Sequence, residues 1–258
     1  MQAIILAGGL GTRLRSVVND VPKCMAPVND IPFINFVVTW LKNEGVQKFV
    51  FSLGYKHELL TSYLDQTFPS LDKVYSIEDE PLGTGGAIKK SFEYITDNNA
   101  IVVNGDTLFN IDISNLFQEH NNYTPACSLA LKEMRNFDRY GTVETDGDHY
   151  ITRFSEKKYC EQGLINGGVY IINKKIFLSK TTGEVFSFEK DFLEKFVGEH
   201  QIMGFQKDYY FIDIGIPEDY QKFQDHYSLI LSKKKYIKNN GDDFTGDFLE
   251  ALLTNFFD

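Results

Sequence analysis

The glycine-rich segment LAGGLGTRL, at residues 6–14, constrains the fold of this chain most strongly, because it continues a short apolar run at residues 3–7. An unbroken apolar run of this length is typical of a strand that is buried on both faces of a parallel sheet. Further apolar runs at residues 49–53 and 101–103 are separated by helix-like spacing, as at residues 33–42, which indicates βαβ units. The first half of the chain therefore predicts a doubly wound α/β layer.

The second half of the chain has a different pattern. Residues 127–172 contain short runs rich in β-branched and aromatic residues, divided by Gly and Asp, which predict antiparallel strands laid on that sheet. A helix is expected over residues 188–196. Pro217 is suited to a first helical position and predicts a last helix over residues 218–230.

The composition changes after this last helix. Residues 233–243 are charged and poor in apolar side chains, which predicts a linker that leads to a short apolar stretch at residues 244–257. We therefore expect one domain over residues 1–230, followed by a charged linker and short C-terminal tail over residues 231–258.

Charge and cysteine content exclude several classes of protein. The 258 residues include 26 Lys+Arg and 36 Asp+Glu, and the net charge of -10 argues against a broad surface for nucleic acid. Three cysteines without a CxxC pair argue against a disulfide framework and a thiolate zinc site. The run at residues 3–7 is too short for a membrane span and lacks the features of a signal peptide. We expect a cytoplasmic protein with no nucleic-acid or membrane partner, and we leave a homo-oligomer open.

The first glycine segment has the properties of a phosphate-binding turn. Gly8, Gly9 and Gly11 let the backbone approach an anion closely, and Arg13 adds donors that suit phosphate oxygens. The dinucleotide pattern GxGxxG fails at Leu14, and the GK[ST] of a P-loop is missing. Taken alone, the segment leaves a purely structural turn as an equal alternative.

A lysine and two aspartates strengthen the phosphate interpretation. Lys23, in VPKCMAPV, lies between the glycine segment and the first expected helix, so it could return to the same phosphates instead of being merely exposed. Asp106 follows the strand at residues 101–103, and Asp213 ends the run YYFIDIG. A Mg2+ ion bridged to phosphates needs only one or two protein carboxylates. The alternative is that either aspartate caps a helix or turn.

A second glycine segment, PLGTGGA at residues 81–87, precedes a helix expected over residues 87–95. Three acidic residues stand directly before it, at positions 78–80. A carboxylate there could accept hydrogen bonds from the N1–H and N2–H groups of guanine. A solvated turn is an equal alternative.

Other polar residues leave more alternatives open. Glu156 and Lys157 could line the remaining pocket or form a surface ion pair, and NGGVY, which begins at Asn166, could line it or form a tight turn. The five histidines show no close metal-ligand spacing, and no Ser or Cys sits in a nucleophile elbow. We assign no catalytic role to any of them.

The motifs form an ordered series that resembles the nucleotidyltransferases that activate sugar 1-phosphates. The series covers residues 1–228 and comprises LAGGLGTRL, VPK, PLGTGGA, NGDT, the EK pair, NGGVY and IDIGIPEDY. The stretches ALKEMRNFDRYGTV and QGLINGGVY most resemble the branch that transfers GMP to D-glycero-α-D-manno-heptose 1-phosphate, followed by the mannose 1-phosphate guanylyltransferases.

The resemblance implies an α/β fold with a Rossmann-like, doubly wound mixed sheet and a small antiparallel sugar-binding subdomain. It implies that residues 1–230 form a nucleotidyltransferase domain with GTP and a sugar 1-phosphate as substrates, Mg2+ as cofactor, and a product used for a surface polysaccharide. It assigns the nucleotide to Leu6, Ala7, Gly8, Gly9, Gly11, Thr12, Arg13, Glu80, Gly83 and Gly86. It assigns the sugar to Tyr140, Gly141, Glu156, Lys157 and Asn166. The expected catalytic residues are Arg13, Lys23, Asp106, Lys157 and Asp213, of which Asp106 and Asp213 hold the metal.

Three departures from the family pattern are visible. Cys24 replaces the usual proline after PK, and Gly85 and Gly167 each replace an alanine. Because all three residues are small, we expect the pocket to persist. The alternatives are the same chemistry with mannose 1-phosphate, the same chemistry with UTP or dTTP and another hexose 1-phosphate, and a catalytically silent nucleotide-sugar sensor. The combination of cations and paired carboxylates favours an enzyme.

Overall fold

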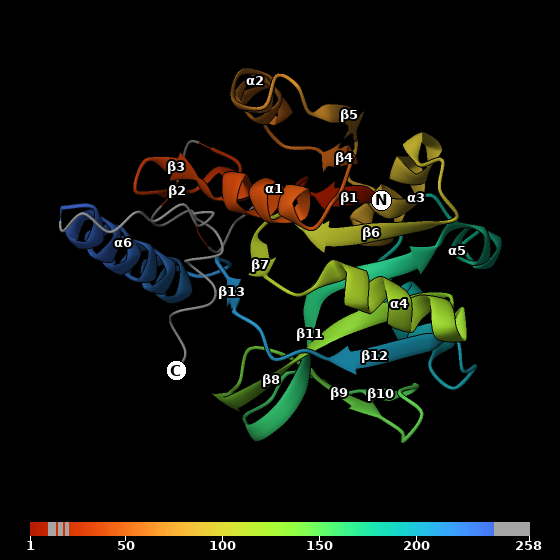
Figure 1. Ribbon diagram of the computed structural model, residues 1–258. Coiled ribbons are helices and arrows are strands. Elements are labelled where there is room, and N and C mark those ends of the chain that lie inside the picture. Colours follow the sequence, from red (N-terminus) through yellow and green to blue (C-terminus); the bar gives the residue numbers. More distant parts are fainter. Residues whose placement is uncertain (10–13, 15–17, 19–20, 240–258) are drawn as a thin grey trace.

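The computed structural model of the chain describes residues 1–9, 14, 18 and 21–239, and side chains in this set up to residue 228 (Figure 1). Within this part, one central sheet has nine strands, seven of them in the order β10-β9-β11-β6-β1-β4-β5. The other two are β8, which pairs with β11, and β12, which pairs with β8. This mixed sheet, with helices packed on it, confirms the predicted α/β class.

The first half of the chain forms the parallel part of the sheet. β1 (Gln2–Leu6) lies between β4 (Lys48–Leu53) and β6 (Asn99–Asn104), and β5 (Asp72–Ile77) pairs with β4 at the edge. Two of the predicted apolar runs fall within β4 and β6, and the first ends one residue beyond β1, at Ala7. Their bounds follow from burial, because a strand covered on both faces cannot alternate polar and apolar residues.

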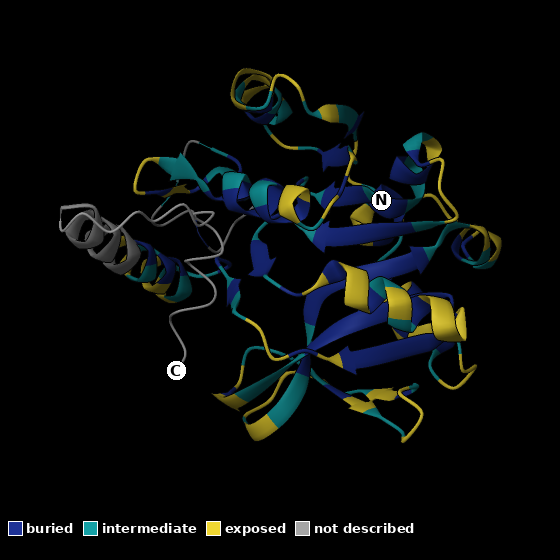
Figure 2. Cartoon of the chain, viewed as in Figure 1, coloured by how far each residue is buried: buried dark blue, intermediate teal, exposed yellow. Residues whose placement is uncertain are grey.

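Alternate residues of β1 serve two hydrophobic cores on opposite faces of the sheet. Ala3 and Ile5 pack in the core that includes α1 (Phe33–Asn43) and α2 (His57–Thr67). Ile4 packs in the core that includes α3 (Gly83–Ser91). Figure 2 shows the sheet as a buried layer between helices whose outer surfaces are exposed. The two cores confirm the doubly wound arrangement.

The antiparallel strands extend this sheet and do not lie on it, which corrects the sequence prediction. β11 (Cys160–Asn173) pairs antiparallel with β6, with Val169 opposite Val103. It then pairs with β8 (Cys127–Phe137) and β9 (Thr142–Thr145), and β9 pairs with β10 (Ile151–Phe154). β12 (Ile202–Gln206) adds to β8 in parallel. The reason is that the backbone N–H and C=O groups along the buried edge of β6 need hydrogen-bond partners, and a strand added in the plane of the sheet supplies them.

Several smaller elements surround the sheet. β2 (Pro27–Val28) pairs with β3 (Ile31–Pro32), and β7 (Thr107–Phe109) pairs with β13 (Phe211–Asp213). Helices α4 (Ile113–Tyr123) and α5 (Lys174–Lys180) pack beside β11. Short 3₁₀ helices occur at Lys23–Met25 and Phe92–Tyr94. None of the helices in the described part of the chain has the length and apolar character of a membrane span.

Three predicted helices differ from the structure in detail. The helix expected over residues 188–196 is present, but its Glu189–Glu194 part is a π-helix. The helix expected at residues 87–95 begins earlier, at Gly83, and ends with a 3₁₀ turn.

The third difference concerns the end of the domain. Helix α6 (Pro217–Asn239) begins at the predicted proline, beside the β2–β3 hairpin and β13 (Figure 1), but it passes residue 230. The helix therefore continues into the segment predicted as a linker, over residues 233–239, because lysine-rich segments are compatible with a helix. The apolar stretch at residues 244–257 lies outside the described residues.

A buried histidine in α4 makes stability depend on pH. His120 is 1% exposed, its Nδ1 lies 2.9 Å from Ser128 Oγ, and its Nε2 has no partner among the described residues. Burial lowers the pKa of His120 to about 4. The neutral imidazole is therefore part of the folded structure.

We predict that the folded state loses stability as the pH falls from 6.5 towards 4. The unfolded chain binds a proton at this histidine near pH 6.5, whereas the folded chain does so only near pH 4. Between pH 7 and pH 5 the loss is about 2 kcal/mol, measurable by urea unfolding. His120→Gln flattens this dependence, whereas His149→Gln, which changes an exposed histidine, retains it. If the free energy of unfolding changed equally with pH in the wild type and in His120→Gln, the assignment of this pH dependence to His120 would be contradicted.

Candidate functional site

A cavity of about 780 Å³ lies at the carboxyl ends of the parallel strands. Its volume is in the range of ligand pockets, roughly 300–1,000 Å³. Residues that end or follow β1, β4, β5 and β6 line it, together with residues of α3, the 3₁₀ helix at Lys23–Met25 and the π-helix. The predicted site residues in its lining are Leu6, Ala7, Gly8, Gly9, Lys23, Gly83 and Asp106.

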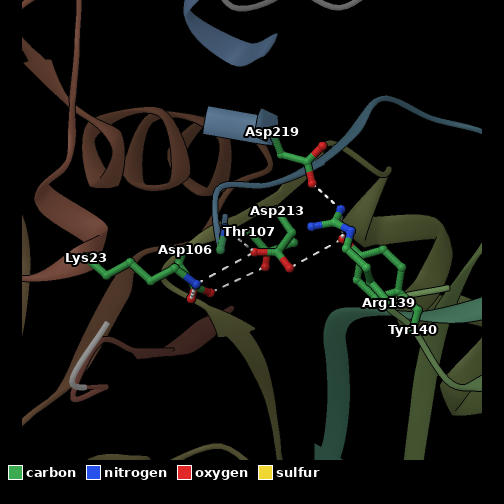
Figure 3. A network of polar contacts seen from close by, with 8 residues as sticks. Lys23, Asp106, Thr107, Arg139, Tyr140, Asp213 and Asp219 are labelled. Carbon is green, nitrogen blue, oxygen red and sulfur yellow. Dashed lines mark hydrogen bonds and ion pairs between the residues drawn. The ribbon is translucent and has the colours of Figure 1, made fainter. Parts of the chain in front are cut away.

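Lys23 is held between two carboxylates. Its Nζ forms an ion pair with Asp106 and lies 3.8 Å from Asp213 Oδ1 (Figure 3). The Lys23 side chain is only 14% exposed. The residue therefore does not fit the alternative of a merely exposed lysine, and all three predicted residues meet at one point.

The backbone brings Asp106 and Asp213 together. Asp213 ends β13 directly opposite Thr107 in β7, and the Asp106 carbonyl accepts a hydrogen bond from Ile214 N–H at 3.1 Å. The Asp213 side chain accepts the N–H of Gly215 at 2.7 Å. Neither carboxylate caps a helix, but the contact with Gly215 makes Asp213 a turn cap, as the alternative allowed. Asp112 caps α4 by accepting the Asn115 N–H.

The electrostatics of this pair favour an added cation. Burial raises the pKa of Asp213, and the charge of Asp106 raises it further, whereas Lys23 lowers it. Two carboxylates that face one ammonium group leave one negative charge without a counter-charge. Their oxygens are the hard ligands that Mg2+ prefers. No cluster of three or more His, Cys, Asp or Glu suited to a metal occurs among the described residues.

Two of the predicted sugar residues, Tyr140 and Gly141, lie in the loop between β8 and β9. Tyr140 contacts Asp213, and Gly141 packs against the residue that follows β10. Tyr140 Oη donates to Asp213 Oδ2 at 3.4 Å. A Cβ at Gly141 would lie 2.3 Å from the Ser155 carbonyl, so only glycine lets this loop approach the end of β10. The next residue after Ser155 is Glu156, which thereby lies near the same loop.

The other sugar predictions receive less support from the geometry. Glu156 and Lys157 are exposed, and the cavity lining includes neither. Asn166 accepts the Gly168 N–H at 3.0 Å and donates to Tyr170 Oη at 2.9 Å, which stabilises the irregular part of β11. Their contacts with a sugar stay predictions.

The second glycine segment contains the start of a helix. Gly83 has φ of +71°, and a Cβ there would lie 2.6 Å from the Phe186 carbonyl. A Cβ at Gly86 would lie 2.1 Å from the Glu184 carbonyl, and Gly85 N–H donates to the Phe186 carbonyl at 3.0 Å. These glycines are required by the approach of residues 184–186, whereas Glu80 and Pro81 are exposed, in agreement with the solvated-turn alternative for the start of the segment.

Two of the three departures from the family pattern also reflect packing. A Cβ at Gly85 would lie 2.2 Å from the Phe186 ring, and a Cβ at Gly167 would lie 2.3 Å from the Phe109 ring. An alanine at either position would therefore displace an aromatic ring, while the pocket itself is present as expected.

The acidic segment contributes residues other than the one predicted. Glu80 is exposed, whereas Glu78 and Asp79 line the cavity. Glu78 accepts the Leu82 N–H at 2.9 Å and the Ser52 hydroxyl at 3.2 Å, so its carboxylate stabilises the start of α3. The contact of Glu80 with a base stays a prediction that the geometry does not favour.

Some lining residues were missed by the sequence analysis. Ser52 and His57 line the cavity because they end or follow β4, and this position at the sheet edge was a signal that could have found them. Glu189, the first residue of the π-helix, lines it without any sequence signal. Cys24 also lines it, but burial raises the pKa of its thiol to about 12, so the thiol stays protonated. The predicted residues Gly11, Thr12 and Arg13 lie outside the described residues.

Comparisons with known proteins agree with this geometry. The family model described as "Nucleotidyl transferase" matches residues 2–228. The D-glycero-alpha-D-manno-heptose 1-phosphate guanylyltransferase of Aneurinibacillus thermoaerophilus is 50% identical over 224 residues, which are 87% of this chain and 97% of the relative. The enzyme of the same name from Campylobacter jejuni subsp. jejuni serotype O:2 is 48% identical, over 86% and 98%. The crystal structure of HddC from Yersinia pseudotuberculosis complexed with GMP-PN has a TM-score of 0.79, 38% identity and coverage of 88% and 99%.

We predict that Gly86→Ala destabilises the fold by about 1–3 kcal/mol, since the new methyl group overpacks against the Glu184 backbone. A fall in the free energy of unfolding would be distinctive, because replacing glycine by alanine inside a helix otherwise stabilises it by about 1 kcal/mol. Urea unfolding measures the change. Gly147→Ala is the matched control, because nothing lies within 4 Å of its Cβ position. An unchanged free energy of unfolding in Gly86→Ala would contradict the packing role.

Proposed function

The chain belongs to the nucleotidyl transferase family, and we propose that it transfers GMP from GTP to D-glycero-α-D-manno-heptose 1-phosphate. The products are GDP-heptose and pyrophosphate. The observation that carries the proposal is the meeting of Lys23, Asp106 and Asp213 at the cavity edge. The relatives that share half of the sequence carry this activity in their names, which supports the choice of nucleotide and sugar.

The chemistry needs alignment more than proton transfer. In the proposed reaction, an oxygen of the sugar 1-phosphate attacks the α-phosphorus of GTP in line, and pyrophosphate leaves. A phosphate monoester has a second pKa of about 6, so the nucleophile is largely ionised at neutral pH. No general base is required. The protein must instead hold two polyanions side by side and balance their charge.

Different residues would contact the triphosphate, the reacting phosphorus and the sugar 1-phosphate. Gly8 and Gly9 at the end of β1 offer backbone to the triphosphate, together with the predicted Gly11, Thr12 and Arg13. Lys23 balances charge at the reacting phosphorus, since it already lies at the cavity edge. Lys157 binds the sugar 1-phosphate. Tyr140, Gly141, Glu156 and Asn166 surround the sugar.

Mg2+ is the proposed metal, with Asp106 and Asp213 as its protein ligands. The donor set fits, because the two carboxylates share a single lysine as counter-charge. When bound, the ion supplies positive charge that stabilises the phosphate oxygens during transfer. We also propose a cytoplasmic location and a product that supplies a surface polysaccharide, in line with the reaction named for the relatives.

We predict that pyrophosphate release in the presence of Mg2+ is confined to GTP with the heptose 1-phosphate. The assay combines GTP, ATP, UTP, CTP and dTTP with the 1-phosphates of heptose, mannose, glucose and N-acetylglucosamine. If pyrophosphate were released with a different pair, the proposed type of reaction would stand, but that pair would replace the proposed substrates. No release from any pair, with nucleotide still bound, would favour the silent sensor.

A second prediction concerns the metal-binding carboxylate. Asp106→Asn lowers turnover at least about 100-fold, because the amide removes a charge from the proposed metal site. The fold persists, since the substitution also removes the repulsion between Asp106 and Asp213. Pyrophosphate release and circular dichroism measure the two effects. Asp72→Asn, on an exposed residue of β5, is the control, and wild-type turnover in Asp106→Asn would disprove the assignment.

A further inference from the structure

Arg139 occupies a place beside the paired carboxylates that the proposed reaction does not use. It lies in the loop between β8 and β9, and its Nη2 forms an ion pair with Asp219 in the first turn of α6 (Figure 3). The guanidinium carbon lies 5.3 Å from the centre of the Tyr140 ring, and Nη2 lies 3.4 Å from Tyr140 Oη. Arg139 thus contacts α6 and Tyr140 at the same time.

Tyr140 in turn contacts β13 in two ways. Its ring packs edge-on against Phe211 with a centroid distance of 6.1 Å, and its hydroxyl donates to Asp213 Oδ2 at 3.4 Å. Phe211 and Asp213 are the first and last residues of β13. A side chain of the antiparallel subdomain is therefore fixed on the strand that carries a proposed metal ligand.

The ion pair of Arg139 is partly buried, which distinguishes it from ordinary surface pairs. Its partners are 35% and 22% exposed. The pair Arg153–Glu144 in the same subdomain is 67% and 58% exposed, with 4.0 Å between the charged atoms. Exposed pairs of the latter kind contribute little, whereas a sheltered guanidinium holds its neighbours in a fixed geometry.

We propose that Arg139 is a positioning residue for this reaction: held by Asp219, it keeps the Tyr140 hydroxyl on the Asp213 carboxylate. The distance between the loop proposed to surround the sugar and the sheet edge proposed to bind the metal then stays fixed. The inference rests on the proposed function, and it concerns one side of the site only. None of these four residues lines the nucleotide cavity.

The first test compares Arg139→Gln with the matched control Arg153→Gln. In Arg139→Gln we expect the KM for the sugar 1-phosphate and the Mg2+ concentration for half-maximal rate each to rise about tenfold, as expected for the loss of one charge-assisted contact. The calorimetric Kd of GTP in EDTA stays unchanged. Arg153→Gln behaves like the wild type in all three measurements.

The second test asks whether Arg139 acts through its neighbours. Tyr140→Phe keeps the ring packing and removes the hydroxyl that reaches Asp213. In a protein that already carries Tyr140→Phe, we expect Arg139→Gln to raise the Mg2+ concentration for half-maximal rate by less than twofold. We expect Asp219→Asn and Arg139→Gln to be non-additive in the double variant, and Arg139→Lys to recover part of the loss.

Specific outcomes would overturn the inference. These are equal behaviour of Arg139→Gln and Arg153→Gln, a fall in kcat with unchanged KM and Mg2+ requirement, or full additivity with Tyr140→Phe. A readout without turnover separates this inference from the proposed function: the rise of the unfolding temperature with Mg2+ and GTP. If the wild type transfers no GMP, the proposed function fails, and an unshifted Mg2+ response of Arg139→Gln in this readout would still disprove the positioning role.

Discussion

The pairing of β11 with β6 is the contact on which both halves of the molecule depend. β6 is buried on both faces, so its second edge must find hydrogen-bond partners within the protein. β11 supplies them with its last residues, and its first residues continue beyond the parallel layer to pair with β8 and β9. The register shifts between Asn166 and Tyr170, where the Asn166 side chain bridges to Gly168 and Tyr170. One strand thus completes the parallel layer and begins the subdomain that carries Tyr140.

Charge balance at the carboxyl edge follows from this arrangement. The end of β6 brings Asp106 to the cavity, the 3₁₀ helix at Lys23–Met25 brings Lys23, and the β7–β13 pair adds Asp213. A lysine that neutralises only one of two carboxylates leaves a negative charge at this edge, which would favour the proposed divalent cation, and a triphosphate would bring still more negative charge. Cys24 cannot substitute as a nucleophile, because burial raises the pKa of its thiol to about 12. The proposed reaction instead uses an oxygen that the sugar 1-phosphate itself carries as the nucleophile.

The sequence predicted the parallel half closely because burial on both faces leaves a clear signal. Residues 3–7, 49–53 and 101–103 were found as apolar runs, and each lies in or beside the strand that the structure contains. Asp106 and Asp213 were predicted from strand ends and Lys23 from its place beside the glycine segment, but the ion pairs of Lys23 with the two carboxylates were not predicted. The reasons for Gly85 and Gly167 could not be predicted, because the rings that exclude a Cβ belong to Phe186 and Phe109, far away in the sequence. The inward position of Glu78 instead of Glu80 likewise depends on where β5 ends, which composition does not reveal.

The two sides of the proposed site are built differently, and this difference has a consequence for specificity. The nucleotide side consists of strand ends and of the start of α3, which the Phe186 and Glu184 carbonyls hold without room for a side chain. Apart from Asn166 in β11, the proposed sugar side consists of loops: Tyr140 and Gly141 between β8 and β9, and the exposed Glu156 and Lys157 after β10. Loops on a rigid scaffold accept substitutions that a packed sheet edge does not. The reaction is therefore constrained by the sheet, whereas the choice of sugar depends on a loop whose distance from the carboxylates must be fixed by side-chain contacts such as that of Tyr140 with Asp213.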